Sequence, residues 1–217
     1  MNRIPVSPRW KSALAAALCA AALAPSWALP DARFDPAFGL FNAASNGDSS
    51  AVDKAADAFD ELMKAEPSNL VLMAYDGAAT SMKATTTLLP WKKMGYAEDG
   101  LARLDKALAL LTPAQDAVIQ HGTPGSLEVK FVAANTFLAV PGFMNRAQRG
   151  AKLLDEVLAS PLFASAALPF KGAVWLRAAR RARAEKREPD ARRWLALVID
   201  NHAPQADKAR ALLQEAS

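Results

Sequence analysis

The fold class is decided by residues 55–67, AADAFDELMKAEP. Ala55, Phe59 and Leu62 recur at spacings of four and three, which places them on one face of an α-helix. The intervening charged residues are left on the opposite side, where water solvates them. Pro67 ends the run because proline removes a helix hydrogen bond and its ring clashes with the preceding turn. The stretch therefore predicts an amphipathic helix that packs against other helices.

The same helical periodicity continues through almost the whole chain and is interrupted only where Pro, Gly, Ser and Asn cluster. Start signals agree with these breaks, since Thr112 and Gln115 form a capping-box pattern with Pro113 at the first helical position. The most strand-like run, residues 129–138, has alanines in its middle and fits a buried helix better. We therefore expect helices throughout, with breaks at 46–48, 67–69, 87–90, 112–113, 121–126, 141–142, 160–161, 188–189 and 203–204.

Composition supports this fold class and excludes others. The chain has 217 residues, of which 52% are hydrophobic and 22% charged, with 10 Gly and 14 Pro. The apolar share is too high for a disordered chain, and Gly and Pro are too sparse for a collagen-like one. Aromatic residues make up only 7%, and Ala and Leu carry the apolar share, which favours close-packed helices over sheets. The sequence indicates one all-α domain.

Residues at fixed offsets indicate a repeat of helix pairs. A tetratricopeptide unit of about 34 residues carries Ala, then an aromatic residue, then Pro towards its end. Ala55, Phe59 and Pro67 stand at those positions, and Gly77 stands where the Gly of the next unit belongs. Small residues there let paired helices approach closely, and large ones fill the gap to the next pair. Looser matches follow at Gly100, Leu104, Ala107 and Pro113, and at Trp175, Ala191, Leu195 and Pro204.

On these residues the chain resembles exported tetratricopeptide-like proteins over most of residues 34–216. It departs from the pattern at Asp76, where Leu is usual, and at Leu195, where an aromatic residue is usual. The resemblance implies an all-α fold of antiparallel helix pairs, stacked as a right-handed α-solenoid with a concave binding surface. An irregular helical array without true repeats is the alternative. The pairs are expected at about 34–66, 69–111, 114–159 and 170–201, with a capping helix at 205–216.

The first 28 residues have the form of a signal peptide. Three basic residues precede the uncharged run 12–25, and Ser26 and Ala28 are small residues at the two positions that a signal peptidase reads. The apolar run is shorter than the roughly 20 residues of a membrane-spanning helix, and no later stretch escapes charge for so long. We therefore expect export to the periplasm, cleavage after Ala28, and no transmembrane segment in residues 29–217.

The single cysteine, Cys19, lies inside the apolar run. The residues before it do not form a lipidation motif, so a lipid anchor at Cys19 is not expected. Residues 29–217 contain no cysteine, which excludes disulfides and thiol chemistry from the exported portion. Its stability must come from the hydrophobic core.

Charge is balanced in total but uneven along the chain. Residues 29–217 carry 23 basic and 22 acidic side chains, which gives no global attraction to nucleic acid or to an anionic membrane. Residues 31–66 hold eight acids and three bases, whereas residues 171–193 hold nine bases and three acids. The basic run has three interpretations: it binds an acidic peptide or a phosphate-bearing ligand, it is a solvated face, or it meets the acidic region of a second copy in a homodimer.

Motifs for catalysis and for metal binding are missing. The chain has no HExxH, GxSxG, Walker A or GxGxxG pattern. Its two histidines, His121 and His202, are interpreted as a loop residue and a helix-end residue, so neither a metal nor a cofactor is expected. Asp57 and Glu61 share a helix face, and an acid–base pair of this kind would be needed for a cell-wall-directed hydrolase or lyase. The sequence instead places both on a polar, solvated face.

The function that fits these observations is a non-catalytic protein-interaction module of the bacterial cell envelope. Its concave surface is expected to bind a peptide or helix, with an acidic partner as one option. The alternatives are the carboxylate-pair hydrolase or lyase, and a carrier that holds apolar ligands between its helices. Lys92 belongs to an amphipathic patch at residues 91–96, which is either a partner surface or a segment whose Trp91 and Tyr96 are buried in the core while its lysines are exposed. The residues predicted to contact the partner are Tyr75, Ser81, Lys83, Lys92, Asn135, Arg177 and Arg181.

Overall fold

The structure, a computed structural model, describes residues 29–215. This part of the chain is helical apart from one two-stranded hairpin, so the all-α prediction is confirmed. None of its helices is long and apolar enough to cross a membrane. The predicted signal peptide, with its cleavage position and Cys19, lies outside the described residues.

The helices follow one another with short connections. A hairpin of β1 (Ile119–Gln120) and β2 (Thr123–Pro124) interrupts them, and its strands pair antiparallel. Short 3₁₀ turns lie at Ser49–Ala51, Pro113–Asp116, Gly142–Met144 and Pro161–Ser165. The α-helices are α1 (Asp31–Ser45), α2 (Val52–Ala65), α3 (Leu70–Thr86), α4 (Pro90–Ala109), α5 (Gly125–Phe137), α6 (Ala147–Ala159), α7 (Leu168–Ala184), α8 (Glu188–Asp200) and α9 (Ala206–Gln214).

Local chemistry explains where these elements begin. Asn69 caps α3, because its side-chain oxygen accepts hydrogen bonds from the backbone N–H groups of Val71 and Leu72 at 3.1 and 3.2 Å. The capping box predicted at Thr112 is confirmed, but it opens a 3₁₀ turn and not an α-helix. The chain then enters the hairpin, and α5 begins only at Gly125, eleven residues after the expected start at 114.

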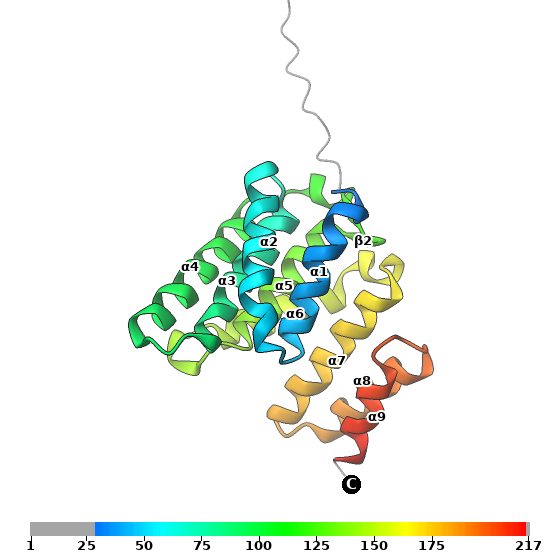
Figure 1. Cartoon of the computed structure of the whole chain (residues 1–217). Coiled ribbons are helices and arrows are strands. Elements are labelled where there is room, and N and C mark those ends of the chain that lie inside the picture. Colours follow the sequence, from blue (N-terminus) through cyan, green and yellow to red (C-terminus); the bar gives the residue numbers. More distant parts are fainter. Residues whose placement is uncertain (1–28, 216–217) are drawn as a thin grey trace, which may run out of the picture.

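Consecutive helices pack against one another in two groups (Figure 1). In the first group α1 packs on α2, α2 on α3, and α3 on both α4 and α5, while α5 packs on α6. The second group consists of α7, α8 and α9, which pack in chain order. Figure 1 shows this second group at the end of the molecule away from α4. Backbone contact between α6 and α7 is sparse, so side chains join the two groups.

The closest helix packing is between α3 and α4. A Cβ atom added at Gly100 would lie 2.1 Å from Oγ of Ser81 and 2.4 Å from the carbonyl oxygen of Gly77. Glycine at both positions lets the two backbones touch. Beside this contact, Arg103 of α4 donates to Asp76 of α3 at 2.5 Å. The carboxylate of Asp76 is thus paired with a cation at the α3–α4 contact.

A single methyl group at this contact tests the packing. We expect Gly100→Ala to lower the free energy of unfolding by about 1–3 kcal/mol, because the added Cβ has no room. The matched change on the same helix is Gly95→Ala, where nothing lies within 4 Å of the added atom. That variant should raise stability by about 0.5–1 kcal/mol, since alanine is the better helix former. Chemical denaturation measures both, and equal effects of the two substitutions would refute the close-contact assignment.

Candidate functional site

A cleft of about 750 Å³ lies between the two helix groups. Residues from α1, α3, α5 and α7 line it, together with the hairpin turn and the segment that leads into α9. Sites for small molecules and peptide side chains typically have volumes of this order. We refer to it below as the cleft.

Aromatic rings form the apolar part of the cleft. Phe38 and Phe41 of α1 lie three residues apart and therefore share a helix face. Their ring centroids lie 5.7 and 5.0 Å from the ring of Tyr75 on α3, with the rings edge to face. On the other side, Phe131 of α5 and Phe170 of α7 lie 5.3 Å apart. The second contact crosses from one helix group to the other.

A buried carboxyl group faces this aromatic part. Oε2 of Glu128, on α5, accepts a hydrogen bond of 2.9 Å from the hydroxyl of Tyr75. Only 6% of the Glu128 surface is exposed, and this burial raises the pKa of its carboxyl from 4.5 to about 7. The hydrogen bond from Tyr75 and the neighbouring His121 lower the pKa of Glu128 by less than burial raises it. The cleft thus contains an acid that is half protonated near neutral pH.

The hairpin turn places His121 at the edge of the cleft. His121 and Gly122 both have positive φ, at 48° and 70°, as a two-residue type I′ hairpin turn requires. The imidazole packs on the rings of Phe34 and Phe38 at 5.0 and 5.2 Å. Its Nε2 lies 2.6 Å from a carboxylate oxygen of Asp35. His121 is therefore half-buried and held by α1.

The opposite part of the cleft is cationic. Arg177 and Arg180 of α7 and Lys208 of α9 line it. Arg177 donates from Nη2 to the backbone oxygen of Asn135 at 3.0 Å. Burial, with a smaller effect of neighbouring Arg180, lowers the pKa of Arg177 to about 10, which still leaves it charged at neutral pH. Neither arginine forms an ion pair with any residue between 29 and 215.

Several buried polar atoms in the cleft have no protein hydrogen-bond partner. They are Oγ1 of Thr123, Nε of Arg177 and Oε1 of Gln205. In the described part of the chain, only Asp76 shares this property outside the cleft. A buried polar group without a partner costs about 1–3 kcal/mol, so such groups mark positions suited to a ligand or to water. The three atoms offer one N–H donor, one hydroxyl and one amide acceptor.

Three of the predicted partner residues, Tyr75, Asn135 and Arg177, meet in the cleft. Ser81 does not line it, because its hydroxyl donates to the carbonyl oxygen of Gly77 in the α3–α4 contact. Lys83 lies 3.5 Å from a carboxylate oxygen of Asp53. Its ammonium group also lies 5.2 Å from the ring centroid of Tyr96. Lys92 is exposed near the start of α4 and does not line the cleft.

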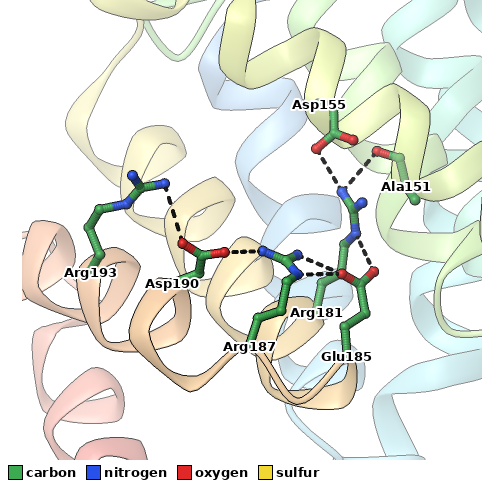
Figure 2. Close-up of polar contacts among 7 residues, drawn as sticks. All are labelled: Ala151, Asp155, Arg181, Glu185, Arg187, Asp190 and Arg193. Atoms are coloured by element: carbon green, nitrogen blue, oxygen red, sulfur yellow. Dashed lines mark hydrogen bonds and ion pairs between the residues drawn. The ribbon is translucent and has the colours of Figure 1, made fainter.

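Arg181 connects the two helix groups and does not line the cleft (Figure 2). Its Nη1 donates to Asp155 at 2.7 Å and to the backbone oxygen of Ala151 at 3.2 Å, both on α6. Its Nε donates to Glu185 at 2.8 Å. The basic run continues in the same way in Figure 2, with Arg187 between Glu185 and Asp190, and with Arg193 at 4.0 Å from Asp190. Asp155 of α6, Glu185 directly after α7 and Asp190 of α8 therefore pair with much of the positive charge that the sequence shows.

The sequence analysis did not identify Glu128, Thr123 or Gln205 as site residues. One signal was available for Glu128, which stands seven residues before Asn135 and so shares its helix face. Thr123 lies in a two-residue strand and Gln205 in a turn, and such short segments give no periodic signal.

Asp57 and Glu61, the acid pair of the enzyme alternative, are exposed on α2 and line no part of the cleft. Within residues 29–215 no three His, Cys, Asp or Glu side chains come together as metal ligands. Comparison of the chain with protein-family models, with curated proteins and with solved structures finds no match.

The buried acid gives a pH dependence with a defined sign. The folded protein holds a proton on Glu128 up to about pH 7, whereas the unfolded chain releases it near pH 4.5. Stability from the neutral carboxyl is therefore complete below about pH 4.5 and is lost as pH rises through about 7. Glu128→Gln cannot ionise. Its free energy of unfolding, relative to the wild type, should increase by roughly 3 kcal/mol from acid to pH about 8.

Urea denaturation of both proteins across this pH range measures the difference. Groups that do not interact with Glu128 ionise alike in the two proteins, so their contributions cancel; the coupled exceptions are Tyr75 and His121. A difference that does not change with pH would contradict the assignment of a protonated Glu128.

Proposed function

We propose that the protein is a non-catalytic binding module of the bacterial cell envelope and that it captures an acidic peptide segment in the cleft. One observation carries this proposal. Arg177 and Arg180, which lack ion pairs within residues 29–215, lie in the same cleft as a group of aromatic rings, which we call the aromatic wall. The aromatic wall consists of the rings of Phe38, Phe41, Tyr75, Phe131 and Phe170. Export by the predicted signal peptide is part of the proposal.

The proposed architecture is a tetratricopeptide-like, right-handed solenoid of antiparallel helix pairs. Support comes from the order of packing, in which each helix contacts the next and α3 also contacts α5. Apart from Lys208 of α9, the helix residues that line the cleft belong to α1, α3, α5 and α7, the first helix of each proposed pair. In tetratricopeptide repeats the first helices form the concave binding surface, which agrees with this assignment.

The residues of the cleft match the groups of an acidic peptide. Guanidinium groups bind carboxylates through paired N–H donors, and Nε of Arg177 is available for such a bond. The rings of Phe41, Phe131 and Phe170 offer surfaces for apolar side chains. Oε1 of Gln205 can accept a peptide N–H. Buried Arg and aromatic residues are the usual energetic centre of a binding interface.

A carrier of apolar ligands with a carboxylate head is the second candidate. The aromatic wall favours it, because a hydrocarbon chain would cover the same rings while its head group bound Arg177. The two candidates differ at Gln205: a peptide can donate a backbone N–H to its Oε1, whereas a fatty acid has no N–H to donate.

A binding titration tests the proposal and separates the candidates. We use a fluorescein-labelled peptide of alternating Glu and Leu, and a fatty acid as competitor. Arg177→Gln should weaken peptide binding by about tenfold or more, because a charged hydrogen bond in a buried site is removed. The matched control is Arg193→Gln, which removes the same charge from an exposed position outside the cleft.

Equal loss in both variants would show that net charge alone binds the peptide and would overturn the cleft assignment. Displacement of the peptide by the fatty acid, with tighter binding of the fatty acid itself, would favour the carrier.

A further inference from the structure

The tip of the α3–α4 hairpin carries a concentration of exposed apolar side chains. Seven large hydrophobic residues are exposed among residues 29–215, and four of them lie between positions 88 and 94. Their exposed fractions are 91% for Leu88, 38% for Leu89, 69% for Trp91 and 41% for Met94. A monomeric soluble protein rarely gathers such residues in one place without a partner for them. We call residues 88–94 the hairpin tip.

The hairpin tip is exposed because α3 and α4 are longer than α5 and α6, the helices packed beside them. α3 has 17 residues and α4 has 20, against 13 for both α5 and α6. Arg146, which precedes α6, and Arg149 of α6 reach Asp105, in the last turns of α4. On the other side, Lys83 is bound to Asp53 of α2. In Figure 1 the α3–α4 connection accordingly stands at an outer corner of the molecule.

The charge of the hairpin tip selects its partner. Residues 77–97 contain three lysines and no acid. Lys92 and Lys93 are both exposed and form no ion pair within residues 29–215. The cleft of a second copy is aromatic and large enough to accept Trp91, but its own charges are also positive, which disfavours it as the receptor. The hairpin tip therefore suits a partner with negative charge at its surface, for the lysines, and an apolar interior, for the leucines and Trp91.

We propose that the hairpin tip binds the surface of an anionic lipid bilayer. Leu88, Leu89 and Trp91 enter the boundary between head groups and acyl chains, where leucine and tryptophan are favoured. Lys92 and Lys93 then lie at the level of the anionic head groups, each contributing a favourable attraction. The site lies away from the cleft, so both can be occupied together. This local basic and apolar surface is compatible with the balanced charge of the whole chain.

The test uses vesicles and the chain from Leu29 onward. All side chains of the hydrophobic core lie between Leu29 and Ala209, so this portion contains the complete described core. Vesicles of phosphatidylcholine with about a third phosphatidylglycerol serve as the anionic surface, and pure phosphatidylcholine as the neutral one. We expect flotation with the anionic vesicles and a blue shift of tryptophan emission, because Trp91 is exposed whereas Trp175 is 8% exposed and Trp194 is half-buried.

Surface variants separate the apolar and charged contributions. Leu88→Ser with Trp91→Ser should abolish flotation, and Lys92→Gln with Lys93→Gln should weaken partitioning by roughly fivefold for each lysine. Phe143→Ser is the matched control, because Phe143 is 67% exposed but lies outside the hairpin tip. It should bind as the wild type does.

Equal binding of all variants, or equal binding to neutral and anionic vesicles, would overturn the proposal. Absence of binding to either vesicle would overturn it as well. Each variant changes an exposed side chain, so unchanged thermal unfolding verifies that the fold is intact. None of these outcomes bears on peptide capture in the cleft.

Discussion

The two-residue turn at His121 and Gly122 is the constraint on which the cleft depends. It closes a hairpin that binds the starts of three helices. Nε2 of Gln120 donates to the backbone oxygen of Leu29 at 3.1 Å, next to the start of α1, and the backbone oxygen of Gly122 accepts from Ala167, which precedes α7, at 3.1 Å. The N–H of Gly125, the first residue of α5, donates to Val118 on the other side of the hairpin. These hydrogen bonds hold the starts of α1, α5 and α7, three helices that line the cleft, to one hairpin.

Much of the fold could be predicted from the sequence because its signals are local. The Asn at position 69 and the prolines at 67 and 90 act on the backbone within a few residues of themselves, so helix boundaries are readable without knowledge of the tertiary structure. Gly77 was singled out in the sequence as a small residue, and in the structure a Cβ atom there would lie 2.8 Å from the backbone oxygen of Gly100 on α4. The hairpin was not predicted, because strands of two residues are too short to show alternation. Its positive φ at a histidine, a residue that does not usually mark such turns, hid it further.

From the sequence, a site residue could be predicted only where its position on a helix face determines whether it lines the cleft. Arg177 and Arg181 stand four residues apart on α7 and look equivalent in the sequence, yet Asp155 of α6 binds the second and no described acid binds the first. That difference depends on which residue of another helix comes within reach, and sequence spacing carries no information about it. Glu128 poses the same problem in reverse. Glu128 directly precedes the run 129–138 that the sequence indicates to be buried, but its hydrogen-bond partner is Tyr75, 53 residues away, and sequence spacing does not reveal that contact.

The sparse packing between α6 and α7 has a consequence for how the molecule unfolds. The α7–α9 group is attached through individual contacts, such as Phe170 on Phe131, Arg181 on Asp155 and the backbone bond from Ala167 to Gly122, and not through a continuous helix interface. Such a group opens with a lower free energy than the rest of the molecule and exchanges its amide hydrogens sooner. The cleft lies along this line of attachment. A molecule bound there would contact both helix groups and so stabilise their association. Its binding would raise the free energy of opening of the α7–α9 group and make the two groups unfold more cooperatively.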